Sequence, residues 1–437
     1  MIDTTESQAL RYASIGDEAA GRPASAPPGE PERSIKSVGI VGAGTMGTGI
    51  AICCLDAGLP TRLVDAAASA AAAAGGRVGA HYDKAVSRGR LTPDAARERQ
   101  ARLATAPGYD ALAGCDLVIE AVFEDMDVKL EVFRQLDRAL QPGALLASNT
   151  STLDLDRIAA ATTRAEDVVG LHFFSPAQVM RLLEVVRGRR TSAATLAAAL
   201  RFGRSIGKVP VVAGVCDGFI GNRMIEEYAR QAYLLVDLGV LPSRVDAVLE
   251  RWGMAMGPFA VMDLAGGDIG WAIRKRRKLE QPDRPYSAFP DRVCELKRFG
   301  RKTGAGYYAY DADAVRREDP LITQIAVEHA RGIACASREI PDEEIIERCI
   351  YALVNEGAKL LDEGIAASAS DIDVVYRNGY GFPAGRGGPM FHADCVGLGR
   401  VLESMRRFAG GYQGWAWQPA HGLLDAARRG ARLTGSR

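Results

Sequence analysis

A histidine and a glutamate interrupt two apolar segments of the sequence. His172 lies in "GLHFFSP" and Glu184 lies in "LLEVV", 12 positions later. An imidazole can take the proton of a substrate hydroxyl near neutral pH, and a carboxylate on its second nitrogen fixes the tautomer and stabilises the imidazolium. If the two segments are neighbouring strands, this spacing brings the carboxylate to one ring nitrogen and leaves the other facing a cofactor. A purely structural His–Glu pair is the alternative.

The N-terminal part of the sequence contains a glycine-rich turn. In "SVGIVGAGTMGTGIA" an apolar strand over 38–41 is followed by Gly42, Gly44 and Gly47, and a helix is expected from about Thr45. In this spacing the first glycine allows the tight turn, the second lets a pyrophosphate approach the backbone, and the third lets helix and strand pack closely. The free N–H groups at the helix start then face the phosphates. The pattern predicts a dinucleotide site.

An acidic residue ends the next predicted strand, "TRLVD". Asp65 stands where a carboxylate binds the ribose 2′-hydroxyl, and it would repel the 2′-phosphate of NADP. The residues that follow are alanines, with no arginine to receive such a phosphate, so we expect NAD as the cofactor. The alanine run over 66–74 predicts a short helix. Two charged helices are expected next, the second beginning at Pro93.

Polar residues end two later apolar strands. "GALLASNTSTL" predicts a strand that ends at Ser148, followed by Asn149 and Ser151, and His172 stands at the end of the next strand. In an open α/β sheet, the residues at the carboxyl ends of the strands line the ligand crevice. The sequence therefore gathers these side chains at the predicted nucleotide site.

The composition narrows the class of protein. The chain has 437 residues, 54 basic and 54 acidic, so no excess positive charge favours nucleic acid as a partner. No apolar run is long enough to span a membrane, and neither a metal site nor a CxxC pair is present among the eight cysteines. We therefore expect free thiols and a cytoplasmic location. Residues 1–34 are rich in Pro, Ala, Ser, Glu and Gly and are expected to form a flexible tail.

Nine segments of the chain together carry a family resemblance. "GAGTMGTGIA", "IEAVFED", "SNTSTL", "GLHFFSP", "LLEVV", "GFIGNR" and "MGPFAVMDLAG" occur in this order, followed by "GRKTGAGYYAYD" and "GYGFPAGRGGPMFHAD". They closely resemble the L-3-hydroxyacyl-CoA dehydrogenase family, and in particular the dehydrogenase half of multifunctional fatty-acid β-oxidation proteins. The resemblance implies oxidation of an L-3-hydroxyacyl-CoA to a 3-ketoacyl-CoA with NAD+.

The resemblance also assigns roles to residues. It makes His172 the catalytic base and Glu184 its partner, with Ser151 and Asn222 binding the reacting hydroxyl and carbonyl. It places Arg88 near the CoA. It implies cofactor contacts at Met46, Asp65, Glu124, Lys129 and Lys302, beside those expected at Gly42, Gly44, Gly47, Asn149 and Ser151.

The sequence departs from the family pattern in three places. Ser175 replaces an asparagine that contacts the nicotinamide side of the cofactor in relatives, and His392 replaces a tyrosine at a position expected on a domain surface. No hydratase domain precedes Ile35, so we expect the protein to lack hydratase activity.

The second half of the chain contains an internal repeat. "RMIEEYARQAYLLVDLG" matches "RCIYALVNEGAKLLDEG", pairing Arg223 with Arg348 and Asp237 with Asp362. The match is extended by pairing Gly239 with Gly364, Pro258 with Pro383 and, after a six-residue insertion, Asp263 with Asp394. Glu347 then stands at the position of Asn222, so the second copy has lost that amide. We expect it to serve as a packing partner, which would make the chain a monomer.

These observations predict an α/β Rossmann-type NAD-binding domain followed by two tandem all-α domains. The expected boundaries are a tail over 1–34, the NAD-binding domain over 35–213, and helical domains over 214–310 and 311–437. A dehydrogenase for a free hydroxy acid and a non-catalytic NAD-binding scaffold are the alternatives to a hydroxyacyl-CoA dehydrogenase. The acyl chain length is not encoded in any motif.

Overall fold

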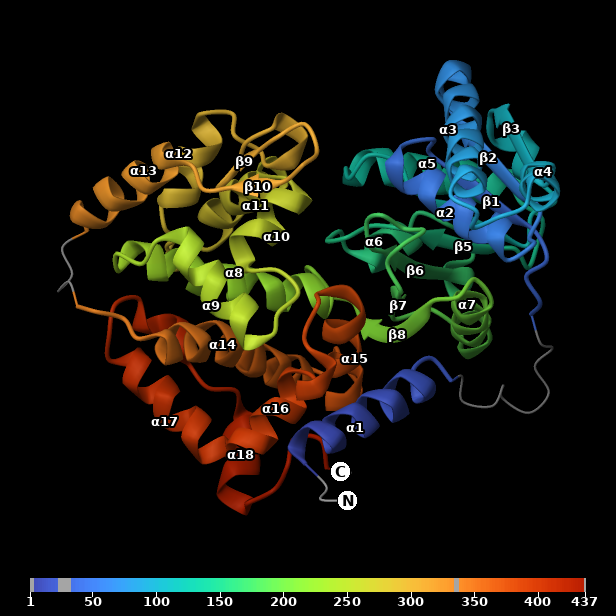
Figure 1. The fold of residues 1–437 in the computed structure, drawn as a ribbon. Coiled ribbons are helices and arrows are strands. Elements are labelled where there is room, and N and C mark those ends of the chain that lie inside the picture. Colours follow the sequence, from blue (N-terminus) through green and yellow to red (C-terminus); the bar gives the residue numbers. More distant parts are fainter. Residues whose placement is uncertain (1–3, 23–32, 334–337, 436–437) are drawn as a thin grey trace. The chain divides into compact units, whose positions relative to one another are not determined.

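The protein folds as two compact units (Figure 1). The computed structural model describes residues 4–22, 33–333 and 338–435. The nucleotide-binding unit contains Ser14–Gly221 and Gly364–Ala367, and the helical unit contains Met1–Ala13, Asn222–Glu363 and Ser368–Arg437. Both copies of the repeat therefore belong to one compact unit. Within the described residues, no helix has the length and apolar character that crossing a membrane requires.

An eight-stranded sheet forms the centre of the nucleotide-binding unit. Its order is β3-β2-β1-β4-β5-β6-β7-β8. Neighbouring strands are parallel except for β6 and β7, which are antiparallel. The order reverses beside β1, where ligands bind in doubly wound folds. The strands are β1 (Val38–Val41), β2 (Thr61–Asp65), β3 (Leu103–Pro107), β4 (Leu117–Glu120), β5 (Leu145–Ser148), β6 (Val168–Phe173), β7 (Leu182–Arg187) and β8 (Val209–Gly214).

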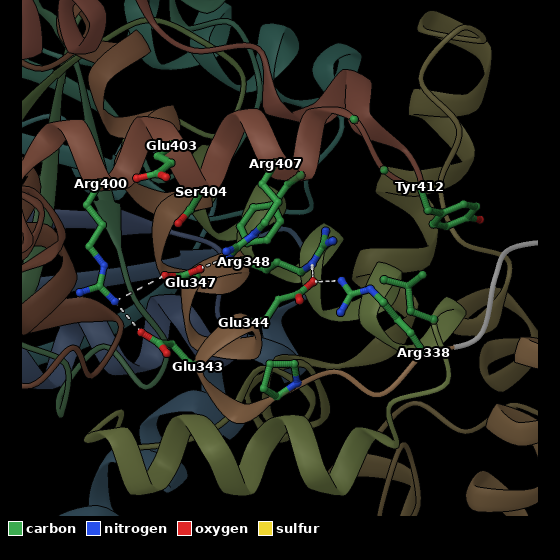
Figure 2. A pocket seen from close by; sticks show the side chains of 15 residues that line it. Arg338, Glu343, Glu344, Glu347, Arg348, Arg400, Glu403, Ser404, Arg407 and Tyr412 are labelled. Atoms are coloured by element: carbon green, nitrogen blue, oxygen red, sulfur yellow. Dashed lines mark hydrogen bonds and ion pairs between the residues drawn. The ribbon is translucent and has the colours of Figure 1, made fainter.

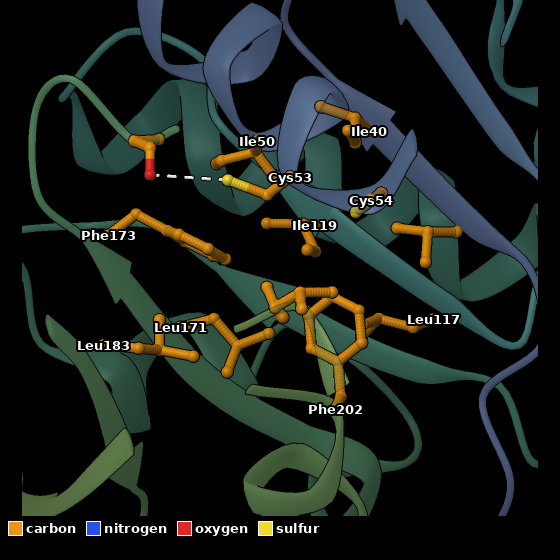
Figure 3. Close-up of a cluster of buried hydrophobic side chains, with 14 of the residues drawn as sticks. Ile40, Ile50, Cys53, Cys54, Leu117, Ile119, Leu171, Phe173, Leu183 and Phe202 are labelled. Atoms are coloured by element: carbon orange, nitrogen blue, oxygen red, sulfur yellow. Dashed lines mark hydrogen bonds between the residues drawn. The ribbon is translucent and has the colours of Figure 1, made fainter. Parts of the chain in front are cut away.

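The apolar runs of these strands and of the helices beside them form the core of the unit. Figure 3 shows side chains from β1, β4, β6 and β7 packed against those of α2 and α7. The alanine run after β2 does not form a short helix of its own, because α3 continues through the first of the two charged segments. The helices are α2 (Thr45–Asp56), α3 (Ala68–Ser87), α4 (Pro93–Gln100), α5 (Met126–Ala139), α6 (Leu155–Ala159) and α7 (Ala193–Ser205).

The helical unit is built from the two copies of the repeat and a short hairpin of β9 (Ala309–Tyr310) and β10 (Arg316–Arg317). The first copy contains α8 (Gly221–Asp237), α9 (Pro242–Trp252), α10 (Pro258–Ala265), α11 (Gly267–Glu280) and α12 (Phe289–Glu295), and α13 (Pro320–Arg331) follows it in the chain. The second contains α14 (Asp342–Asp362), α15 (Ala369–Gly379), α16 (Pro389–Val396), α17 (Leu398–Ala409) and α18 (His421–Arg429). The predicted class, a Rossmann-type domain followed by duplicated helical domains, is confirmed.

One pairing in the predicted repeat is wrong. Buried Asp246 accepts hydrogen bonds from the first backbone N–H groups of α10, which begins at Pro258. Buried Asp373 accepts the same bonds from α16, which begins at Pro389. Pro258 therefore corresponds to Pro389 and not to Pro383. The inserted residues lie before α16, because a helix N-terminus must keep its acidic partner to satisfy its free N–H groups.

The prediction of a flexible tail is also wrong for residues 4–22, because they contain helix α1 (Thr5–Ala19), whereas its stretch over 23–32 lies outside the described residues. Ala9 and Ala13 are buried in the helical unit. The hydroxyl of Tyr12 donates to Asp373 at 2.8 Å, and its ring stacks on Phe391 at 4.6 Å. In the first copy, Tyr308 donates the equivalent bond to Asp246. The N-terminal helix therefore supplies the second copy with a contact that a later segment supplies to the first.

Candidate active site

The glycine turn is shaped to receive a phosphate group. Gly42 has a φ of +102°, and a Cβ there would lie 2.5 Å from the carbonyl oxygen of Ala121. A Cβ on Gly47 would meet the oxygen of Gly42 at 1.8 Å, so helix α2 can only approach β1 with glycine at this position. A Cβ on Gly44 would contact nothing within 4 Å. The turn is thus tight on two sides and open at Gly44, where the helix begins.

Asp65 holds this turn from the end of β2. Its Oδ2 accepts the N–H of Ala43 at 2.8 Å, and its Oδ1 accepts the N–H of Ala67 at 3.0 Å. Arg77 of α3 reaches the same turn and donates to the oxygens of Ala43 and Thr48. The carboxylate predicted to bind the ribose therefore lies at the glycine turn, and a guanidinium that the sequence did not indicate lies there too.

A buried lysine connects β4 with the loop that follows it. The ammonium of Lys129 is 1% exposed and lies 2.7 Å from Oε1 of Glu120 and 3.2 Å from Oε2 of Glu124. Glu120 also accepts the hydroxyl of Ser148 at 2.7 Å. Breaking such a buried pair on one side costs about 3–5 kcal/mol, because it leaves an uncompensated charge. Lys129 is thus held by two protein carboxylates, and its contact with the cofactor stays a prediction.

Glu124 fixes the loop after β5. Its Oε1 accepts the hydroxyl of Thr150 at 2.7 Å and the backbone N–H groups of Ser151 and Thr152 at 2.8 and 3.2 Å. Burial opposes the ionisation of Glu124, but the charge of Lys129 and these hydrogen bonds outweigh it and lower the pKa of the carboxyl. An ionised Glu124 therefore holds the backbone of Ser151 at the end of β5.

Asn149 links this loop to the strand that carries the histidine. Its Oδ1 accepts the backbone N–H of Phe173 at 2.9 Å, one residue after His172. The remaining predicted contacts of this unit differ in exposure: Met46 packs partly against the core, whereas Ser175 and Arg88 are exposed. Arg88 stands at the C-terminal end of α3. Their contacts with cofactor and CoA stay predictions.

His172 and Glu184 face each other directly across the antiparallel β6–β7 pair, as the spacing predicted. Nδ1 of His172 lies 2.7 Å from Oε2 of Glu184, and the carboxylate is fully buried. Its Oε1 accepts the backbone N–H groups of Ile220 and Gly221 at 3.1 and 2.9 Å. Phe219 lies against the imidazole, with ring centroids 5.7 Å apart. Both carboxylate oxygens are therefore occupied, and Glu184 can act only as an acceptor toward the ring.

This arrangement selects one tautomer of the histidine. A carboxylate accepts hydrogen bonds only, so Nδ1 carries the proton and Nε2 is left with a lone pair. Within the described residues, Nε2 makes no hydrogen bond. A ring of this kind can take a proton at Nε2, and the buried carboxylate stabilises the resulting positive charge.

Two predicted site residues belong to the helical unit. Asn222 lies in the first turn of α8, and its Oδ1 accepts the hydroxyl of Tyr380 at 2.8 Å. This contact leaves the amide N–H₂ of Asn222 as a donor. Lys302 forms a salt bridge with Asp268 at 2.5 Å. Their proximity to the nucleotide stays a prediction.

Comparison with known proteins supports the same reading of both units. Residues 37–216 match the NAD-binding domain of 3-hydroxyacyl-CoA dehydrogenase, and residues 218–310 and 345–432 match its C-terminal domain. The dehydrogenase part of multifunctional enzyme 1 from C. elegans is 30% identical, with a TM-score of 0.69, and the match covers 95% of this chain and 96% of that one. The chain belongs to the 3-hydroxyacyl-CoA dehydrogenase family. It carries the NAD-binding domain of the family, so NAD is confirmed as its cofactor.

Other relatives extend the comparison. The 3-hydroxybutyryl-CoA dehydrogenase of Escherichia coli is 27% identical, with a TM-score of 0.77 and coverage of 91% of this chain and 99% of that one. The human peroxisomal bifunctional enzyme is 41% identical over 427 residues, which are 93% of this chain and 59% of the human protein. The chain thus spans under two thirds of the length of the curated relatives it matches.

The cytoplasmic location expected from the cysteines is contradicted by these relatives, which are named peroxisomal or glyoxysomal enzymes. The described cysteines are indeed free thiols. Free thiols indicate only that no disulfide is needed for folding, and they do not determine the compartment. Targeting signals are short segments recognised by receptors, and the amino-acid composition does not reveal them.

Three residues that contact the predicted site residues or their neighbours were not predicted from the sequence. Arg77 and Tyr380 reach their partners from distant segments, and Glu120 lay hidden in an apolar strand. In the sequence, the one indication of Glu120 is its charge in the apolar strand "LVIE", because a buried charge requires a partner.

His392 is half-buried and lies edge-on to Trp252 at 5.1 Å, and burial lowers its pKa to about 4. It is therefore a neutral packing residue.

Proposed function

We propose that the protein oxidises an L-3-hydroxyacyl-CoA to a 3-ketoacyl-CoA with NAD+, with His172 as the base. The observation that carries this proposal is the 2.7 Å contact between the buried carboxylate of Glu184 and Nδ1 of His172, in the same unit as the glycine turn. Bound NAD+ would supply the acceptor for the hydride that leaves the substrate carbon. The residues of the chain supply the proton acceptor and the geometry.

His172 takes the hydroxyl proton at Nε2 while the carbon–oxygen bond becomes a carbonyl. The charge of His172 rises by one unit in this step, and the carboxylate of Glu184 beside it is already held by two backbone N–H groups. No side chain has to move to accommodate the new charge, which is the advantage of a preorganised site. The reverse reaction uses the same proton on the imidazolium.

Ser151 and Asn222 are proposed to bind the reacting oxygens. Glu124 holds the backbone of Ser151, and Tyr380 orients the amide of Asn222 so that its N–H₂ group can donate. A donor aimed at the position where charge develops contributes about 3–4 kcal/mol in comparable sites.

The following contacts with the cofactor are proposed as well. Asp65 would accept the ribose hydroxyls, the turn at Gly42–Gly47 would receive the pyrophosphate, and Glu124 and Lys129 would hold the loop beside the nicotinamide. Met46, Asn149, Ser175 and Lys302 complete the proposed cofactor set, and Arg88 the proposed CoA set. The preference for NAD+ over NADP+ is measured as the ratio of kcat/KM for the two, and equal values would remove Asp65 from the ribose.

The names of the relatives support a CoA ester as the proposed substrate. These relatives are named as 3-hydroxybutyryl-CoA dehydrogenase and as bifunctional or multifunctional β-oxidation enzymes. NADH formation is to be followed with 3-hydroxybutyryl-CoA, a longer 3-hydroxyacyl-CoA and free 3-hydroxybutyrate. Turnover of the CoA esters is expected. Turnover of the free acid alone would favour a hydroxy-acid dehydrogenase, and no turnover with intact NAD binding would favour a scaffold.

His172→Ala tests the base. The variant should lose at least about 10²-fold in kcat, the usual contribution of a positioned base. Its affinity for NADH, followed by fluorescence, should persist because the glycine turn is unaffected. Near-normal turnover would end the proposed mechanism.

A monomer is proposed for the assembled protein, because both copies of the helical repeat lie in one compact unit. In symmetric dimers one patch serves both partners, and a tandem copy can occupy it within one chain. Light scattering after size exclusion tests this, and a mass of twice 46.6 kDa would contradict it.

A further inference from the structure

A charged cavity of about 770 Å³ lies in the helical unit and contains none of the residues assigned to the active site. It lies between α14 and α17, and Leu238 at the end of α8 forms part of its wall (Figure 2). Cavities of this size are in the range that holds small organic molecules. Its walls carry four arginines and four glutamates beside apolar surface: Arg338, Arg348, Arg400, Arg407, Glu343, Glu344, Glu347 and Glu403.

The charges of the cavity are not evenly paired. At one end, Arg400 lies between Glu343 and Glu347, and Arg407 also pairs with Glu347. At the other end, Arg338 and Arg348 share the single carboxylate of Glu344. Figure 2 shows both arginines reaching the carboxylate of Glu344, where they donate to the same oxygen, Oε1. One positive charge is therefore left over at the Arg338–Arg348 end.

Arg348 is the residue on which this excess falls. Its side chain is only 3% exposed, and its Nε donates to Glu344 at 2.9 Å. Nη1 is buried and has no hydrogen-bond partner among the described residues. The guanidinium stacks on Phe408 at 4.3 Å. Burial, together with the neighbouring Arg338, lowers the pKa of Arg348 despite Glu344. A buried guanidinium with an unsatisfied nitrogen is costly unless a further acceptor is present.

The first copy of the repeat shows which acceptor fits. Arg223, the counterpart of Arg348, donates to Glu356 at 2.7 Å and through both terminal nitrogens to Glu363 at 2.5 and 2.8 Å. In the pairing that matches Arg223 with Arg348, Gln231 corresponds to Glu356 and Leu238 to Glu363. These two residues of the first copy would therefore face Arg348. Neither is charged, Leu238 lines the cavity, and Oε1 of Gln231 is itself buried without a partner. The duplicated contact has thus lost both carboxylates on one side, and the cavity lies at the position of Leu238.

We propose that this cavity binds a small organic monocarboxylate. Its carboxylate pairs with the guanidinium of Arg348 as Glu363 pairs with Arg223, and its apolar part lies against Leu238 and Phe408. A carboxylate matches the planar donor fork of arginine with two parallel hydrogen bonds. A polyanion is disfavoured, because Glu343, Glu347 and Glu403 line the same space. This site is independent of the dehydrogenase reaction.

Butyrate and hexanoate serve as probes, with the full-length chain and matched ionic strength. Thermal-shift and calorimetric titrations should show saturable binding to the wild type, tighter for hexanoate because more apolar surface is buried. Arg348→Lys keeps the positive charge but removes the fork, and it should weaken binding at least about tenfold. Inorganic phosphate at the same concentration should bind more weakly.

Leu238→Glu rebuilds the missing carboxylate and provides the sharper test. The variant should unfold at a higher temperature than the wild type without ligand, and it should no longer respond to butyrate. Leu279→Glu is the matched control, since Leu279 is 86% exposed in the same unit, and this variant should bind butyrate like the wild type. The proposal is overturned if the wild type shows no saturable binding, if Leu238→Glu and the wild type respond alike, or if phosphate binds as well as butyrate.

Discussion

Replacing Glu184 by Gln should reverse the tautomer of His172. The two backbone N–H groups of Ile220 and Gly221 point at one oxygen of the carboxylate, and Nδ1 of His172 points at the other. A glutamine has one oxygen and one N–H₂ group, so it must choose between these partners. If its oxygen stays with the two N–H groups, its N–H₂ faces Nδ1, which must then give up its proton. Nε2 becomes protonated and cannot accept another proton.

The structure decides which orientation wins. The opposite orientation would aim the N–H₂ group at two buried N–H donors, each of which would lose its acceptor at a cost of about 1–3 kcal/mol. The total of about 2–6 kcal/mol exceeds the small preference between the two tautomers of a free imidazole. The variant also loses the charge that stabilises the imidazolium. An acid-to-amide change at such a histidine partner lowers kcat by about 10⁴ in a serine protease, so a loss of about 10²–10⁴ is expected here.

The assay is NADH formation from 3-hydroxybutyryl-CoA across pH, with NADH affinity measured separately. Glu184→Gln should keep its NADH affinity, and ¹⁵N NMR should find the proton of His172 on Nε2 instead of Nδ1. Glu184→Asp keeps the charge at a greater distance and should lose less activity. A variant within tenfold of the wild-type kcat would refute the role of the pair. Lost turnover with an unchanged tautomer would refute the tautomer argument alone.

Three further outcomes are expected. Tyr380→Phe frees the oxygen of Asn222 and should lower kcat by about fivefold with an unchanged KM for NAD+, since one neutral hydrogen bond contributes about 1 kcal/mol; equal kcat would show that Asn222 needs no support. Tyr12→Phe removes a hydrogen bond to Asp373 and should lower the unfolding free energy by about 1–2 kcal/mol in urea denaturation, while a truly loose N-terminus would give no change. Burial raises the pKa of Asp373 to about 7, so the folded state keeps this proton above the pH at which the unfolded chain releases it. The unfolding free energy should therefore fall as pH rises from about 4 to about 7, and Asp373→Asn should reduce that slope.

The local parts of the site could be predicted, because the chemistry and its support lie close together in the sequence. The glycine turn needs a strand, three glycines and a helix within one short segment. The His172–Glu184 pair needs only two adjacent antiparallel strands, and the register places the two residues opposite each other. In both cases the pattern of apolar and special residues determines the local geometry.

Supporting contacts from distant segments could not be predicted. Tyr380 and Asn222 are 158 residues apart, and no periodicity links them. Lys129 resembles an ordinary helix-surface lysine in sequence, yet it is buried between two acids. Helix α1 was obscured by the disorder-like composition of the whole segment. Its buried residues Ala9 and Ala13 do have helical spacing, which is the signal that a shorter window would have revealed.

The duplication explains why the helical unit is asymmetric in its details. Each copy has a buried aspartate at the N-terminus of a helix. Asp246 accepts backbone N–H groups at the start of α10, and Asp373 accepts the corresponding groups of α16. The third donor differs, because Tyr308 comes from the first copy itself and Tyr12 from the N-terminal helix. A second copy that kept only its packing framework was free to lose the amide of Asn222. If Asn222 acts as proposed, Tyr380 gives that copy a part in the reaction, because its hydroxyl orients the amide that the first copy retains.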